Sequence, residues 1–99
     1  IFVDRDGVLI VDKHHLTDIN KVEIIRTSID AVKIFNKLGY LVIGISNQSV
    51  VARGLSTENE VNRINNSIIN TYKKYGAVIN KIYFCPHHPD AIIHEYKKL

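Results

Sequence analysis

The sequence predicts an α/β domain built on a Rossmann-like parallel sheet with flanking helices. Three short apolar runs, typical of buried strands, alternate with two segments in which apolar residues recur at helical spacing. This alternation implies parallel strands joined by right-handed crossovers. The chain has 99 residues, of which 45% are hydrophobic, and this length suffices for one core. We therefore expect residues 1–99 to form a single domain.

The first expected strand is the apolar run at residues 1–3, which ends at Asp4. A short, continuous apolar run of this kind predicts a strand that is buried on both faces. Two further apolar runs follow, at residues 8–11 and 22–25. These two runs could pair as a small hairpin or flap.

The first expected helix begins at Thr27 or Ser28, either of which can cap it, and stops at Gly39. Its apolar stripe consists of Ile29, Ala31, Val32, Ile34, Phe35 and Leu38. The second strand is then expected at residues 41–45.

The second helix is indicated by Thr57 and Glu60, which have the spacing of a capping box. In that motif each side chain satisfies a backbone N–H group of the first helical turn. The apolar face of the helix consists of Val61, Ile64, Ile68 and Tyr72. Gly76 ends the helix, and residues 78–84 are the third expected strand.

Composition excludes several classes of protein. The net charge of +3 arises from scattered Lys and Arg residues without a basic block, so no nucleic-acid partner is expected. No apolar run approaches the roughly 20 residues of a membrane span, so we expect no membrane partner. No surplus amphipathic helix argues for a dimer, and we expect a monomer. Cys85 is the single cysteine, which excludes an internal disulfide and favours the reducing cytoplasm.

The acidic pair Asp4 and Asp6 lies where the first strand gives way to a turn, and Gly7 permits a tight bend there. Ligands of open parallel sheets bind beyond the carboxyl ends of the strands. Two carboxylates this close repel each other, and a divalent cation such as Mg²⁺, which prefers hard oxygen ligands and bridges to phosphate, relieves the repulsion. The alternative is a surface turn with two solvated aspartates.

The segment 1–9, in which D-x-D-G-V-L follows an apolar strand, resembles the first motif of the haloacid dehalogenase (HAD) superfamily of phosphohydrolases. The resemblance implies that Asp4 is the nucleophile and becomes an aspartyl phosphate, while Asp6 acts as general acid and base. It also implies that Asp4 and the backbone carbonyl of Asp6 ligate Mg²⁺.

A second cluster of polar residues follows the second strand. The Ser46 hydroxyl and the Asn47 amide can donate hydrogen bonds to the oxygens of a transferring phosphoryl group, although they could merely cap the next segment. The run S-N-Q-S-V-V-A-R-G at residues 46–54 resembles a segment of the heptose bisphosphate phosphatase and histidinol phosphatase branch of the superfamily. Ser46 matches the superfamily's second motif. Arg53 could pair with a substrate phosphate or form a structural salt bridge.

The run C-P-H-H-P at residues 85–89 also matches this branch, in which a Cys-x-His pair and a later Cys-x-Cys pair bind a structural zinc. The resemblance implies that Cys85 and His87 are two Zn²⁺ ligands of the four that such a site takes. Cys85 could instead be a buried, inert residue. His88 and His94 could in principle substitute as ligands, although nothing in their spacing demands it. His14 and His15 are expected to be solvated loop residues, although the flap could bring one of them near the substrate.

The likeness implies a capless, HAD-like phosphatase that acts on a small phosphorylated metabolite. The branch points to D-glycero-D-manno-heptose 1,7-bisphosphate, with histidinol phosphate as the nearest alternative. The superfamily's third-motif Lys and fourth-motif Asp are absent from these residues. We therefore expect the N-terminal part of the sheet, with residues 1–4 as an exposed apolar edge and little activity in isolation. The rival hypotheses are a receiver-like phosphate-binding module and a truncated, inactive chain.

Overall fold

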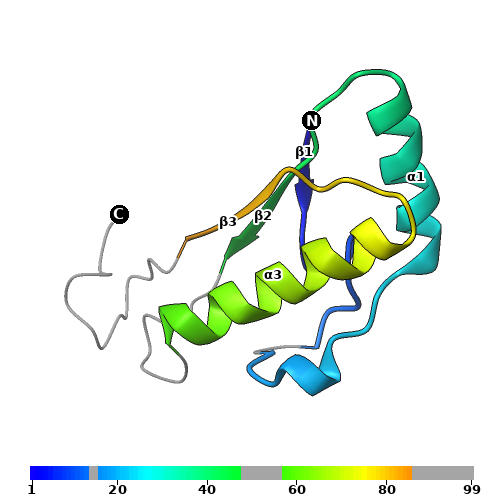
Figure 1. Cartoon of the computed structure of the whole chain (residues 1–99). Helices are drawn as coiled ribbons and strands as arrows, with labels where there is room; N and C mark the ends of the chain where they lie inside the picture. Colours follow the sequence, from blue (N-terminus) through cyan, green and yellow to red (C-terminus); the bar gives the residue numbers. More distant parts are fainter. Residues whose placement is uncertain (14–15, 48–56, 86–99) are drawn as a thin grey trace.

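The computed structural model describes residues 1–13, 16–47 and 57–85, in which the expected α/β order is present (Figure 1). Three parallel strands form one sheet in the order β1-β2-β3: Phe2–Asp4 (β1), Ile43–Asn47 (β2) and Lys81–Cys85 (β3). The helical elements are the 3-10 helix Ile19–Lys21 (η1) and the α-helices Arg26–Lys37 (α1) and Glu58–Lys74 (α3). The predicted fold class is confirmed.

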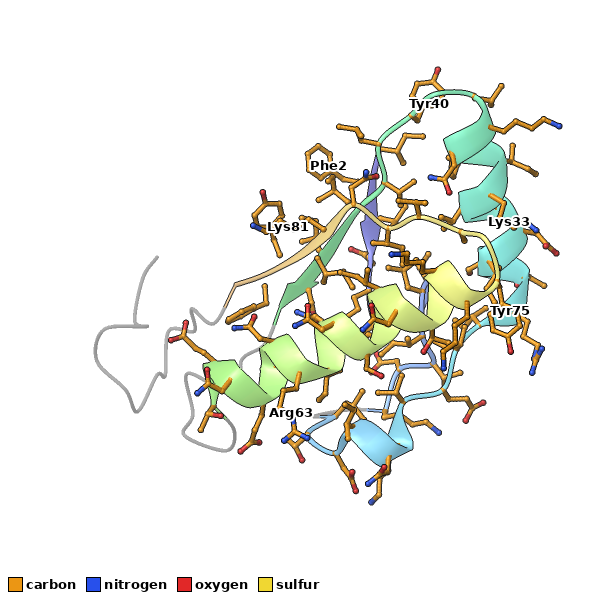
Figure 2. All side chains as sticks on the ribbon, in the orientation of Figure 1. Phe2, Lys33, Tyr40, Arg63, Tyr75 and Lys81 are labelled. Atoms are coloured by element: carbon orange, nitrogen blue, oxygen red, sulfur yellow. The ribbon has the colours of Figure 1, made fainter. Side chains whose placement is uncertain are left out.

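The sheet has one covered face and one exposed face. Parallel pairing places Val3 beside Gly44 and Gly44 beside Ile82, and this row contacts the core. Glycine is required in the middle of the row because a Cβ at Gly44 would lie 2.9 Å from Cγ1 of Ile82. The neighbouring row points away from α3, and Figure 2 shows Phe2 and Lys81 on that side. Phe2 is 74% exposed there.

The expectation that the first strand is buried on both faces is therefore wrong. Both crossovers run in the same direction across the sheet, and right-handed connections of this kind place α1 and α3 on one face. Side chains of both helices accordingly share one core cluster with the sheet. β1 lies at the edge of the sheet formed by the described residues, with Ile1 and Phe2 exposed, as predicted for residues 1–4.

Helix α1 differs from its prediction at its start and in the width of its apolar stripe. It begins at Arg26 without a side-chain cap, and the Ser28 hydroxyl donates instead to the carbonyl oxygen of Val8. The stripe is narrower than expected, because Ile34 and Leu38 are 58% and 66% exposed. The buried or partly buried apolar residues of α1 are Ile29, Val32 and Phe35.

Strands β2 and β3 begin later than the apolar runs predicted. The Asn80 side chain accepts a hydrogen bond from the Val42 N–H at 2.8 Å, and the Asn80 N–H donates to the Val42 carbonyl oxygen at 2.9 Å. A side chain thus replaces a backbone partner at this position. Regular pairing starts one residue further on, at Ile43 and Lys81.

Helix α3 follows its prediction closely. The Thr57 hydroxyl oxygen accepts from the Glu60 N–H at 3.1 Å, so the predicted N-cap is confirmed. The helix ends before Gly76, which has a φ of +81°, a conformation that glycine adopts without steric cost. Its predicted apolar face is buried, namely Val61, Ile64, Ile68 and Tyr72. Asn65 is also buried: helical spacing places its position on this same face, but the predicted face included apolar residues only.

The two apolar runs at residues 8–11 and 22–25 do meet. Ile10 and Ile24 form an isolated antiparallel bridge, and the Val11 N–H donates to the Glu23 carbonyl oxygen at 2.8 Å. The predicted pairing is confirmed in this reduced form. Among the described residues, no helix combines the length and the apolar character that crossing a bilayer demands.

Tyr72 ties α3 to the segment that follows β1. Its side chain is fully buried, and its hydroxyl donates to the Leu9 carbonyl oxygen at 2.7 Å. Burial disfavours the phenolate and raises the pKa of Tyr72 from 10.0 to about 12, against a smaller lowering effect of a hydrogen bond with Ser28. The neutral phenol is therefore the form that the folded chain stabilises.

Replacing Tyr72 with Phe should flatten the dependence of the unfolding free energy on alkaline pH. The folded chain keeps the phenol proton while the unfolded chain loses it above pH 10.0, so this contribution is complete below pH 10.0 and lost as the pH rises to about 12. The loss amounts to about 2–3 kcal/mol. Urea denaturation across this range measures it, with the exposed Tyr40→Phe as control. Parallel pH curves for the two variants would contradict the assignment.

Candidate active site

Asp4 occupies the carboxyl end of β1, as the sequence predicts. It is the last residue of the strand, it lies opposite Ile45 of β2, and it is exposed. Pairing continues one residue beyond the strand, because the Arg5 N–H donates to the Ile45 carbonyl oxygen at 2.8 Å. Asp4 therefore projects from a rigid backbone, with its side chain open to solvent.

The turn after β1 places Asp6. The N–H groups of Leu9 and Ile10 both donate to the Arg5 carbonyl oxygen at 3.0 Å, and the Gly7 N–H donates to the Ile10 carbonyl oxygen at 2.8 Å. Gly7 has a φ of +86°, and a Cβ there would meet nothing within 4 Å. The backbone conformation, rather than lack of space, thus requires glycine at this position.

Asp6 and Ser46 are brought together across β1 and β2. The Ser46 hydroxyl donates to Oδ2 of Asp6 at 2.8 Å, and Ser46 is only 3% exposed. The serine at the end of the second strand is therefore part of the same site as the acidic pair. Its hydroxyl is oriented by Asp6 in this structure.

Arg5 binds both oxygens of the Asp6 carboxylate. Nε donates to Oδ2 at 3.1 Å and Nη2 donates to Oδ1 at 2.9 Å. This bidentate pair of hydrogen bonds is strong and fixes the relative orientation of the two groups. The third contact of the guanidinium is Nη1, which donates to Oδ1 of Asn65 at 3.0 Å. The Arg5 side chain is 1% exposed, and that of Asp6 is 26% exposed. The charge of Arg5 is thus buried beside its counter-ion.

Neither Arg5 nor Asn65 was among the predicted site residues. A signal for Arg5 was present, because side chains alternate along a strand and Arg5 shares the parity of the core-facing Val3. An arginine on the core side of a strand must find a partner, since burying a lone charge is very costly. Two carboxylates, Asp4 and Asp6, adjoin Arg5 in the sequence, and the structure pairs it with Asp6.

The residues that are present fit a bound Mg²⁺. Asp4 supplies an exposed carboxylate, and Asp6, two residues on, offers hard oxygen donors beside it. Mg²⁺ sites commonly use one or two carboxylates and complete their shell with water and substrate phosphate. Within the described residues there is no group of three or more His, Cys, Asp or Glu side chains placed to hold a metal.

The other predicted site residues are only partly described. Asn47 and Cys85 end β2 and β3 and pair with each other in register, so their backbones lie at the same edge of the sheet as Asp4. Their side chains lie outside the described part of the chain. So do the following residues entirely: His14, His15, Arg53, His87, His88 and His94.

Comparison with known proteins supports the fold and the kinship. No protein-family model matches the chain. The D-glycero-β-D-manno-heptose-1,7-bisphosphate 7-phosphatase of Photorhabdus laumondii is 34% identical over 98 residues, which are 99% of this chain and 52% of that protein. The chain spans about half the length of the curated relatives it matches.

Two crystal structures share the fold. The D,D-heptose 1,7-bisphosphate phosphatase of B. bronchiseptica, in complex with magnesium and phosphate, is 30% identical with a TM-score of 0.81, over 91% of this chain and 51% of that one. A Mesorhizobium loti protein described as a HAD-like phosphatase has a TM-score of 0.87 at 24% identity, over 92% of this chain and 44% of that one. The chain has a partial HAD-like fold and is related to the D,D-heptose 1,7-bisphosphate phosphatases.

Proposed function

We propose that the protein containing this chain is a Mg²⁺-dependent phosphoric monoester hydrolase that forms an aspartyl-phosphate intermediate. The observation that carries the proposal is the placement of two aspartates at one strand end. Asp4 is exposed and projects from β1, while Asp6 is held by Arg5 and Ser46. One carboxylate is thus accessible for attack, and the other is oriented for proton transfer.

The proposed reaction proceeds in two steps. Asp6, which accepts hydrogen bonds as a carboxylate in this structure, first takes up a proton from solvent. A carboxylate oxygen of Asp4 then attacks phosphorus, the bond from phosphorus to the leaving oxygen breaks, and Asp6 gives that oxygen its proton. Asp6 then takes a proton from water as the water oxygen attacks phosphorus, and the bond to Asp4 breaks. Phosphate leaves, Asp4 is again a carboxylate and Asp6 is again protonated. Bound Mg²⁺, held by Asp4 and the Asp6 carbonyl, would offset the negative charge that the reacting groups share.

The remaining predicted residues complete this proposal. When substrate binds, the Ser46 hydroxyl would turn from Asp6 to donate to a phosphoryl oxygen, Asn47 would donate to another, and Arg53 would pair with a substrate phosphate. Cys85 and His87 would supply two ligands of a structural Zn²⁺ in the whole protein. A cytoplasmic location is also proposed, since the single cysteine of the chain suits a reducing compartment.

The proposed substrate is D-glycero-D-manno-heptose 1,7-bisphosphate, and phosphate is released from its 7 position. The support is the kinship with the heptose bisphosphate phosphatases, one of which was crystallised with magnesium and phosphate. A monomer that needs no macromolecular partner is sufficient for this chemistry. Histidinol phosphate is the competing substrate to be tested beside it.

The experiment is a phosphate-release assay on the protein expressed from its complete coding sequence. We expect the heptose bisphosphate to be hydrolysed faster than histidinol phosphate. Removal of divalent ions with EDTA should lower turnover about a hundredfold or more, since the metal supplies several kcal/mol of charge stabilisation. Adding back Mg²⁺ alone should restore it, which separates Mg²⁺ from any structural zinc. Turnover that is unaffected by EDTA, or absent with every phosphate ester, would contradict the proposal.

A further inference from the structure

We infer that Asn65 of α3 is a positioning residue that acts through Arg5 to orient the Asp6 carboxylate. This inference rests on the proposed function of Asp6 as the acid that protonates the leaving oxygen. Asn65 is 60 positions away from Arg5 in the sequence, yet the two side chains are in direct contact. The guanidinium lies between the helix and the acidic pair.

The first observation is that Arg5 divides its hydrogen bonds between Asp6, in the turn after β1, and Asn65, on α3. Nε and Nη2 hold the two oxygens of Asp6, and Nη1 donates to Oδ1 of Asn65 at 3.0 Å. The guanidinium is rigid and planar, so fixing Nη1 in space restricts rotation of the edge that binds Asp6. Without Asn65, the side chain of Arg5 would keep its ion pair but lose its anchor on α3.

The second observation is that burying the Asn65 amide is energetically unfavourable. The residue is 3% exposed, and its Nδ2 has no hydrogen-bond partner among the described residues. A buried amide donor without a partner destabilises a fold, and an apolar residue would avoid that loss. Turning the amide over offers no remedy, because Nδ2 would then face the donor Nη1 of Arg5. Contact with Arg5 is the interaction that accounts for an asparagine here.

The third observation is the rigidity of the helix that carries Asn65. Its sequence neighbour Ile64 and the residue one turn later, Ile68, are 2% and 0% exposed in the core. Tyr72 ties the same helix to the Leu9 carbonyl oxygen. Close packing of this kind leaves the Asn65 carbonyl little freedom to move. A fixed Asn65 carbonyl thereby holds the Arg5 guanidinium, and the guanidinium holds the Asp6 carboxylate.

The test compares Asn65→Leu with Asn62→Leu, the same change at an exposed position of α3. Release of the leaving group in the first turnover is measured on p-nitrophenyl phosphate, whose leaving group needs little protonation, and on the sugar phosphate that the wild-type protein hydrolyses. The first turnover is chosen because Asp6 acts as base on both substrates in the second step. Asn65→Leu should lower this first-turnover rate on the sugar phosphate on the order of tenfold, and lower it much less on p-nitrophenyl phosphate. KM should change little. A loss of folded protein would lower both rates equally. The ratio of the sugar-phosphate rate to the p-nitrophenyl phosphate rate therefore reports on protonation of the leaving oxygen by Asp6.

A second variant keeps the inference testable if Asn65→Leu folds poorly. Arg5→Lys retains the positive charge but lacks the planar guanidinium that binds both oxygens of Asp6. Like Asn65→Leu, it should lower the ratio of the sugar-phosphate rate to the p-nitrophenyl phosphate rate. Adding Asn65→Leu to Arg5→Lys should cause little further change, because both act through one guanidinium. The positioning role is wrong if the ratio of the two rates is the same in Asn65→Leu as in Asn62→Leu. It is also wrong if the loss in the double variant equals the product of the losses in Asn65→Leu and Arg5→Lys. If the wild-type protein hydrolyses neither ester, it is the proposed function that fails.

Discussion

Replacing Asp4 with Asn should lower Mg²⁺-dependent phosphate release by about 10³-fold or more, the scale seen when a catalytic nucleophile is removed. The amide has nearly the shape of the carboxylate but lacks its charge and its nucleophilic oxygen. Because Asp4 is exposed and makes no hydrogen bond identified among the described side chains, its replacement should leave the unfolding free energy nearly unchanged. Initial rates on the heptose bisphosphate measure the effect.

The control for this experiment is Asp30→Asn, the same change at an exposed aspartate on α1, far along the chain from the acidic pair. It should retain wild-type turnover. A loss shared by both variants would mean that general charge, rather than Asp4, is responsible. Wild-type turnover in the Asp4 variant would show that this residue does not attack phosphorus.

The second large effect is expected from Asp6→Asn. General acid and base catalysis contributes about 10²–10⁴-fold, so turnover of the sugar phosphate should fall by that factor. Hydrolysis of p-nitrophenyl phosphate should fall less in its first step, because its leaving group departs without a proton. An asparagine can still accept one bond from Arg5, but it cannot deliver the proton that an alkoxide leaving group requires.

Asp6→Asn should also destabilise the fold, unlike Asp4→Asn. Arg5 is 1% exposed and would keep a buried charge without its counter-ion, a situation that costs about 3–5 kcal/mol when the pair is fully buried. The Asp6 side chain is 26% exposed, so we expect a smaller loss, about 2–3 kcal/mol. Chemical denaturation of the two variants side by side measures the difference. Equal stability of both would contradict the structural role assigned to the ion pair.

Local chemistry explains what the sequence predicted well. The cap at Thr57 and the turn at Gly7 depend on contacts within a few residues, and both are present in the fold. The ends of parallel strands meet at one edge of a sheet, and for this reason the order of strands and helices along the chain is enough to predict that Asp6 and Ser46 share one site.

The features that were missed depend on contacts between distant segments. Ser28 donates to the Val8 carbonyl oxygen rather than capping α1, and this bond exists only once the chain has folded back. Phe2 is exposed because both crossovers run in the same direction across the sheet and place their helices on its other face. The sequence of a single strand does not contain this information. The contact of Arg5 with Asn65 joins two distant segments. Helical periodicity places position 65 on the buried face of α3, but nothing in the sequence pairs it with Arg5.

The identity of the nucleophile is the central claim, and trapping the intermediate tests it most directly. The protein expressed from its complete coding sequence is mixed with substrate and Mg²⁺, quenched during turnover and reduced with borohydride, which converts an aspartyl phosphate to homoserine. Mass spectrometry of the peptide that contains residues 1–9 should locate the reduced side chain at position 4. Reduction at position 6, or no reduced residue in an enzyme that is turning over, would contradict the assignment of Asp4.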